Sequence, residues 1–188
     1  MTDEVKVEVR RSGRTFEAEA VLDLGADAQT IWDTITDYDA LARFMPGIHH
    51  CHVSERHPRG DGDELVVVEQ RGEFRFMMFA QTMQVLLNIE NRHLHSSVAK
   101  AVRFDLGSFF TRRAIEAFEG RYTLTRLQVD GGSPRTHLVY TALIGLRLPP
   151  PPTVGHMALR QNLVVQLEAV AREVARRAGR PDARPRVV

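Results

Sequence analysis

The feature that most constrains the fold is a long amphipathic segment near the C-terminus, Thr153–Ala178. Its apolar side chains recur at spacings of three and four, which places them on one face of a single helix. These residues are Leu159, Leu163, Leu167, Val170 and Val174. Four consecutive prolines precede the segment and Gly179 follows it, so both ends are marked, with Thr153 as the expected N-cap. A helix of this length gains most of its stability from an apolar partner, which the rest of the chain must provide.

Most of the chain before this helix has the alternating pattern of β-strands, so we expect the partner to be a sheet. In Thr136–Leu148 every second residue from Leu138 onward is apolar, and Phe16–Leu24 alternates in the same way. Val5–Val9 belongs either to one long first strand or to a hairpin with Phe16–Leu24. Further strands are expected at Ile48–Glu55, Glu64–Arg71, Phe74–Asn91, His93–Phe104 and Glu119–Leu127. Gly72-Glu73 reads as a turn, and the very long Phe74–Asn91 strand as bent.

Two short helices are predicted between the first strands. Helical spacing begins at Ala28, with Asp27 at or next to its N-cap, and a second short helix begins at Leu41. Residues 105–117 are irregular, with a helical turn expected at Ala114–Phe118. The order of elements predicts an α+β fold, in which a curved antiparallel sheet wraps around the C-terminal helix. We assign residues 1–179 to one domain and expect 180–188 to be a disordered tail.

Composition excludes several classes of protein. The chain has 188 residues, 43% of them hydrophobic, and a net charge of +1, so nothing indicates binding to nucleic acid. No apolar run reaches the roughly 18 residues of a membrane span, and the charged start of the chain predicts no signal peptide. Cys51 is the one cysteine, so no internal disulfide can form, which fits a reducing, cytoplasmic location.

Two stretches resemble a known family. The first is Ala28–Tyr38, with its tryptophan and Asp-Tyr pair, followed by Met45-Pro46-Gly47; the second is Phe118–Leu124. They resemble the START-like (SRPBCC, Bet v 1-like) superfamily, in its polyketide cyclase/dehydrase and coenzyme Q-binding branch. The resemblance covers most of residues 15–178 and implies the helix-grip fold, with a long cavity between sheet and helix. Two departures are Tyr122, where tryptophan is more usual, and Phe109–Glu116, which looks longer and could lengthen a lid.

In such a cavity, small residues beside aromatic ones would leave room for a ligand and keep the walls apolar. Gly120 stands between Phe118 and Tyr122, and Ala142 follows Tyr140 at the same alternation. These five residues are the predicted ligand-binding set, with the two tyrosine hydroxyls as polar handles for an apolar or aromatic molecule. The alternative is that both tyrosines are core residues whose hydroxyls reach outward.

The other chemistry-bearing residues are weaker candidates. His49-His50-Cys51-His52 lacks a metal-ligand spacing, so we predict no metal, and Cys51 is expected to be a small buried apolar residue rather than a nucleophile. Gly60–Glu64 suits a hairpin turn better than a calcium loop. The charged strand residues are Arg71, Arg75, Lys100, Arg103, Glu119 and Arg121. A buried arginine would hold a carboxylate or enolate, but outward ion pairs are favoured.

The predicted function is binding of an apolar small molecule, such as a lipid, quinone or polyketide-like aromatic, in the sheet–helix cavity. The resemblance keeps a cyclase or dehydratase as an alternative, with Tyr122, Tyr140 or a nearby histidine as proton carrier. A further alternative is a protein-interaction module, and a homodimer is left open. No cofactor motif is found.

Overall fold

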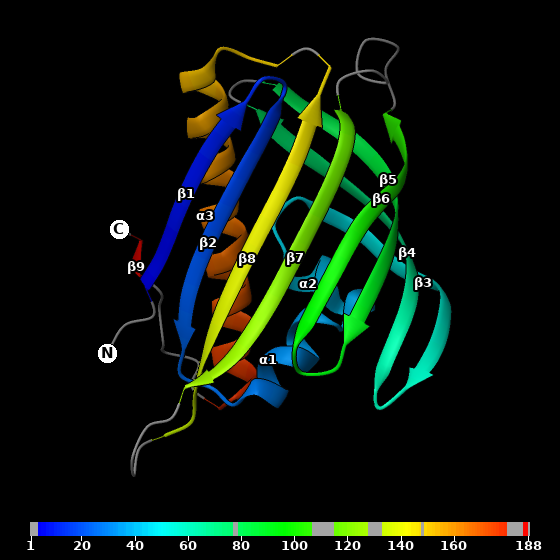
Figure 1. Ribbon diagram of the computed structural model, residues 1–188, viewed down its shortest axis with the longest axis vertical. Helices are drawn as coiled ribbons and strands as arrows, with labels where there is room; N and C mark the ends of the chain where they lie inside the picture. The colour runs from blue at the N-terminus through cyan, green and yellow to red at the C-terminus, as the bar shows by residue number, and fades with distance from the viewer. Residues whose placement is uncertain are drawn as a thin grey trace.

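The computed structural model describes residues 4–76, 79–106, 115–127, 133–147, 149–179 and 186–187. Within them a curved sheet of nine strands packs against one long helix, α3, with two short helices at one end (Figure 1). The strands are β1 (Glu4–Ser12), β2 (Thr15–Leu24), β3 (Ile48–Gly60), β4 (Asp63–Phe76), β5 (Phe79–Arg92), β6 (Ser96–Leu106), β7 (Ile115–Leu127), β8 (Arg135–Leu146) and β9 (Arg186–Val187). The helices are α1 (Ala28–Ile35), a 3-10 turn (Tyr38–Ala40), α2 (Leu41–Phe44) and α3 (Pro152–Arg177). The predicted α+β helix-grip fold is confirmed.

The strand order explains how distant parts of the chain meet. It runs β3-β4-β5-β6-β7-β8-β2-β1-β9, and all described pairs are antiparallel except β1 with β9. The last long strand, β8, therefore lies beside β2, with Ala18 opposite Ala142. This pairing brings the N-terminal hairpin over α3, which lies behind β1, β2 and β8 in Figure 1.

Helix α3 has the predicted apolar face. Leu159, Leu163, Leu167, Val170 and Val174 are all buried. Its start differs from the prediction, because α3 begins at Pro152 and the N-cap is Pro151 instead of Thr153. A proline suits the first helical position, where the N–H that it lacks would have no partner within the helix. The prediction at α1 is confirmed, since Asp27 Oδ1 accepts a hydrogen bond of 2.8 Å from the backbone N–H of Thr30.

The predicted turn at Gly72-Glu73 is wrong, because β4 continues through both residues to Phe76. Gly72 is needed for a different reason: a Cβ at this position would collide with the carbonyl oxygen of Gly47. That oxygen also accepts a 2.7 Å hydrogen bond from the backbone N–H of Glu73. The glycine therefore lets the segment after α2 lie directly on β4. A glycine in a strand pattern can mark either a turn or a close approach of two backbones, so the sequence did not distinguish them. The expected long strand consequently begins only at Phe79, in β5.

Other expectations concern residues near the edges of the described ranges. Ile115–Phe118 belong to strand β7, so the helical turn predicted there is wrong for these residues. Most of the proposed lid, at residues 109–114, lies outside the described residues, as do residues 180–185 and 188 of the expected tail. In that tail Arg186 and Val187 pair in parallel with Glu4 and Val5 of β1. No helix in the described ranges is both long and apolar enough to span a membrane.

The buried apolar residues form two separate clusters. The larger packs α3 and α1 against β2 and β8, with Leu22, Leu138 and Leu167 almost fully buried. The smaller lies around Tyr38 and is built mainly from β4 and β5, with Val66 and Val68 at its centre. Because the curved sheet does not close on the helix between the two clusters, residues of both face a shared cavity.

Candidate ligand-binding cavity

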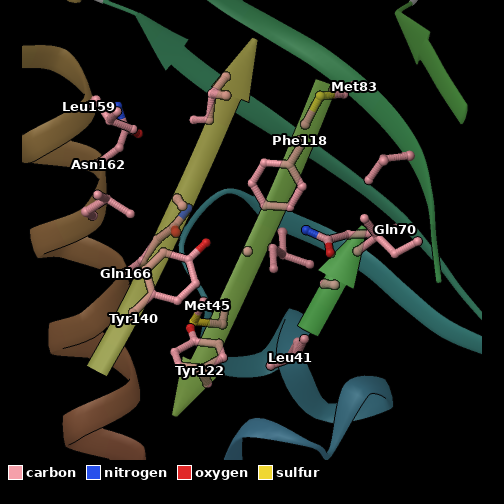
Figure 2. Close-up of a pocket in the computed structure, with 18 of the residues that line it drawn as sticks. Leu41, Met45, Gln70, Met83, Phe118, Tyr122, Tyr140, Leu159, Asn162 and Gln166 are labelled. Atoms are coloured by element: carbon pink, nitrogen blue, oxygen red, sulfur yellow. The ribbon is translucent and has the colours of Figure 1, made fainter. Parts of the chain in front are cut away.

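The cavity has a volume of about 620 Å³, within the range of about 300–1,000 Å³ typical of small-molecule pockets. Its walls come from the sheet, from α3 and from the segment around α2, as Figure 2 shows. Aliphatic and aromatic side chains form most of the lining, among them Val68, Val85, Leu87, Ile144 and Leu163. Such a lining favours apolar molecules, because their burial removes apolar surface from water.

All five predicted ligand-binding residues line this cavity. Strands β7 and β8 place them on one wall by register: Gly120 lies opposite Ala142, and Tyr122 lies opposite Tyr140. Phe118 stands on the same face of β7, two residues before Gly120. A Cβ on Gly120 would be 2.8 Å from the Tyr140 hydroxyl, so the glycine keeps that hydroxyl accessible.

The two tyrosines are the most distinctive polar groups of the wall. Their ring centroids lie 4.6 Å apart at an interplanar angle of 42°. Among the described residues, neither hydroxyl has a hydrogen-bond partner, although Tyr140 is only 8% exposed. Burial raises the pKa of Tyr140 to about 12 and also raises the pKa of Tyr122, which the neighbouring Tyr140 raises further. Both phenols are therefore protonated at neutral pH and can donate a hydrogen bond into the cavity.

A buried polar network beside Tyr122, whose partner across β6 and β7 is Ser97, was missed in the sequence. The Tyr38 hydroxyl donates to Asn91 Oδ1 at 2.9 Å and lies 3.4 Å from Ser97 Oγ. Asn91 Nδ2 in turn donates to Glu64 Oε1 at 3.0 Å, and Arg56 binds the same carboxylate. Burial raises the pKa of Tyr38, so its hydroxyl stays protonated and keeps this orientation. No local pattern could have linked the residues, because Tyr38 and Asn91 are 53 positions apart.

Three amide side chains also line the cavity and were not predicted. Gln70 extends from β4, and Asn162 and Gln166 extend from α3 (Figure 2). Their signal was present in the sequence: Gln70 continues the apolar alternation of Val66 and Val68, and Asn162 and Gln166 stand four residues apart beside the leucine stripe. Asn162 Nδ2 donates back to the carbonyl of Ala158 at 2.8 Å.

The charged candidates lie outside the cavity wherever their side chains are described. Glu119 pairs with Lys100 at 3.3 Å and with Arg121 at 3.6 Å on the outer face of the sheet. Arg71 and Arg103 are exposed. The side chain of Arg75 falls outside the described set. The preference for outward ion pairs is thus confirmed for the Glu119 group, and no cationic side chain among the described residues lines the cavity.

The histidine-rich strand does not form a site in the described structure. His49, His50 and His52 are exposed on edge strand β3, and His52 Nδ1 lies 3.2 Å from Asp39 Oδ1. Among the described residues, no three His, Cys, Asp or Glu side chains are grouped so that they could hold a metal ion. Cys51 is buried, and this burial raises its pKa to about 12, so it is a thiol at neutral pH. The turn between β3 and β4 is at Asp61 and Gly62, both with positive φ.

The comparisons with known proteins agree with this architecture. The sequence profile of the family described as polyketide cyclase / dehydrase and lipid transport matches residues 24–171. The chain belongs to this family. A search of the curated proteins finds no match. The resemblance to this family, which was predicted from Trp32, the Asp37-Tyr38 pair and Phe118–Leu124, is confirmed.

Solved structures share the fold of this family member. A START superfamily protein from Mycobacterium smegmatis is 16% identical, with a TM-score of 0.67 over 85% of this chain and 97% of that chain. The Zhui aromatase/cyclase from Streptomyces sp. R1128 is 18% identical, with a TM-score of 0.62 over 87% and 96% of the two chains. The di-domain ARO/CYC StfQ from the steffimycin biosynthetic pathway is 14% identical, with a TM-score of 0.62 over 88% of this chain and 52% of that chain. At these identities the likeness shows a common fold.

Proposed function

We propose that this protein binds an apolar small molecule with an aromatic or quinone-like ring system in the cavity between its sheet and α3. The observation that carries the proposal is the pair of hydroxyls of Tyr122 and Tyr140, which have no hydrogen-bond partner among the described residues and open into a mostly apolar cavity. A phenol that faces a mostly apolar cavity has few partners for its hydrogen bond, and a ligand acceptor would provide one. Membership of a family described by cyclase, dehydrase and lipid-transport activity supports the same reading.

The experiment is native mass spectrometry of the protein purified from its own cells, followed by denaturation and identification of any released molecule. We expect a stoichiometric apolar molecule in the wild type and in Leu143→Phe, whose side chain is 41% exposed on the outer face. Ala142→Phe, one residue away, fills the cavity from the β8 wall and should be empty although folded. A molecule that remains on both variants would be bound elsewhere and would contradict the proposal.

A second candidate function is a reaction on the bound molecule, of the cyclase or dehydratase type. The specific observation in its favour is the position of two neutral phenols that can donate a hydrogen bond to a ketone or to the enolate formed from it. A tyrosine with a pKa of about 12 is a poor base at neutral pH, so Tyr140 would act as a donor. No histidine among the described residues lines the cavity, which leaves the tyrosines as the predicted proton carriers.

The binding and reaction hypotheses predict different results for the Tyr140→Phe variant. A binding protein retains its ligand in this variant with reduced affinity and shows no turnover in either form. An enzyme retains binding and loses turnover, because the substitution removes only the hydroxyl. A protein-interaction module would be indifferent to this change and to Ala142→Phe. The described exposed large apolar side chains are Val102, Leu127 and Leu143 on three strands and Met157 and Val165 on α3, so they are spread over the sheet and the helix, which gives this third alternative little support.

A further inference from the structure

The polar side chains that face the cavity are all uncharged. Among the described residues, the polar side chains that line it are those of Tyr38, Gln70, Ser97, Tyr122, Tyr140, Asn162 and Gln166. All are hydroxyls or amides, and the raised pKa values of the three tyrosines keep their phenols uncharged at neutral pH. This wall can donate and accept hydrogen bonds, but it offers no counter-charge to an ionised ligand.

Charged groups around the cavity do not themselves line it, including Arg11, which donates to the carbonyl of Pro150 at 3.0 Å and lies 5.4 Å from the centroid of the Phe16 ring. On β7 the alternation directs Phe118, Gly120 and Tyr122 inward, and the intervening Glu119 and Arg121 pair with each other outside at 3.6 Å. Glu64 does not line the cavity and is connected to it by hydrogen bonds through Asn91 and Tyr38, and Arg56 binds its carboxylate at 2.9 Å. A carboxylate or phosphate in the cavity would lose its water without gaining an ion pair, which is strongly unfavourable.

Two of the amides stand on opposite walls. Figure 2 shows Gln166 extending from α3 on one side and Gln70 from β4 on the other, with Tyr140 between them. Neither glutamine has a hydrogen-bond partner among the described residues. Each amide has an N–H donor and a carbonyl acceptor, so each can bind a ligand ketone or hydroxyl. The two together match a molecule that carries such groups at both ends of an apolar body.

We propose that the cavity selects an uncharged ligand with ketone or hydroxyl groups at two ends, held by Gln70 at one wall and Gln166 at the other, and that it rejects carboxylates. This proposal rests on the proposed function, since it specifies the chemistry of the molecule bound in the same cavity. The tyrosine hydroxyls bind polar groups along the middle of that molecule. The cavity therefore selects its ligand for the absence of charge as well as for an apolar body.

The test compares two probes of almost the same size and shape, 6-(hydroxymethyl)anthraquinone-2-carboxamide and 6-(hydroxymethyl)anthraquinone-2-carboxylic acid, which carry a polar group at each end, by calorimetric or fluorescence titration at pH 7. We expect the carboxamide to bind at least about tenfold more tightly, because the acid is ionised at this pH. Lowering the pH should leave the carboxamide unaffected. The affinity of the acid should rise about tenfold per pH unit until the pH approaches the pKa of its carboxyl group, because only its neutral form enters.

Substitutions test the two walls. Gln70→Leu and Gln166→Leu should each weaken carboxamide binding about five- to tenfold, while Gln161→Leu, at an exposed position of α3, should not. Unchanged binding in both cavity variants would overturn the two-wall arrangement. Carboxylate binding as tight as carboxamide binding, and independent of pH, would overturn charge selection and leave the proposed function standing. If neither probe binds the wild type although native mass spectrometry finds a bound apolar molecule, the inference fails and the proposed function stands; if the wild type also carries no such molecule, both fail.

Discussion

Tyr122 and Tyr140 face each other across β7 and β8 with ring centroids 4.6 Å apart, and neither hydroxyl meets a partner within the described residues. Cross-strand pairing of the two aromatic rings accounts for the contact, but it does not account for the hydroxyls. In a well-packed core, buried phenols are hydrogen-bonded. The pair is therefore suited to a ligand, and its cost to stability can be measured.

The first prediction concerns Tyr140→Phe. Removing a hydroxyl that has no protein partner should leave the free energy of unfolding unchanged or slightly higher, within about 0.5 kcal/mol. The affinity for a neutral aromatic ligand should fall by about 1 kcal/mol, or roughly fivefold. Urea denaturation and ligand titration of the same preparation measure both quantities. A large loss of stability would mean that the hydroxyl has a structural role instead.

The second prediction concerns the polar network beside the cavity. Asn91 is 1% exposed and connects the Tyr38 hydroxyl to Glu64. Asn91→Leu leaves the Tyr38 hydroxyl with only the 3.4 Å contact to Ser97 Oγ and Glu64 with Arg56 alone, and should lower the free energy of unfolding by about 1–3 kcal/mol. Adding Tyr38→Phe to this variant should recover part of the loss, because one stranded group is then removed. Asn88→Leu, at an exposed position of β5, is the control and should change stability by less than about 0.5 kcal/mol.

The third prediction concerns the contact between Gly72 and Gly47. Gly72→Ala should destabilise the fold by about 1–3 kcal/mol, because the new methyl group collides with the Gly47 carbonyl oxygen and displaces the segment after α2. Arg71→Ala, on the exposed face next to it, should be nearly neutral. The measurement is the melting temperature of each variant in thermal unfolding, compared with that of the wild type. Equal melting temperatures would show that this segment can move without cost.

The fourth prediction concerns pH and Glu173 on α3. Hydrogen bonds from Arg176, opposed by partial burial and aided by Arg177, lower the pKa of Glu173 from 4.5 to about 2. Arg177 also binds Asp37 at 2.9 Å, so the carboxylate anchors α3 to the segment after α1. Because the folded-state pKa is the lower one, the stabilisation is complete above pH 4.5 and is lost as the pH falls toward 2.

Comparison with Glu173→Gln measures that contribution. The variant should be less stable than the wild type by about 2 kcal/mol at pH 7, and the difference should shrink to nearly zero at pH 2. Glu168→Gln is the matched control, since Glu168 pairs with Arg172, which is half exposed, and exposed pairs contribute little. A difference that stays constant between pH 7 and pH 2 would contradict the assignment.

Much of the candidate site was predictable because its walls obey local periodicities. Alternation along β7 and β8 placed Phe118, Gly120, Tyr122, Tyr140 and Ala142 on inward faces, and each lines the cavity. The same rule applied to Gln70 would have found it as well. Asn162 and Gln166 were overlooked because polar residues beside an apolar helix face resemble the solvent side of an ordinary amphipathic helix.

The sequence by itself determined most of the strands and helices and which residues share a face, because these depend on periods of 2 and 3.6 residues and on nearby caps. Asp27 and the leucine stripe of α3 are of this kind. Only the tertiary structure decided that Gly72 permits a close approach to Gly47, and that the Tyr38 hydroxyl is bound to Asn91 while that of Tyr140 is not. These outcomes depend on which strands lie side by side and in what register, and therefore on residues far apart in the chain, whose contacts no local pattern encodes.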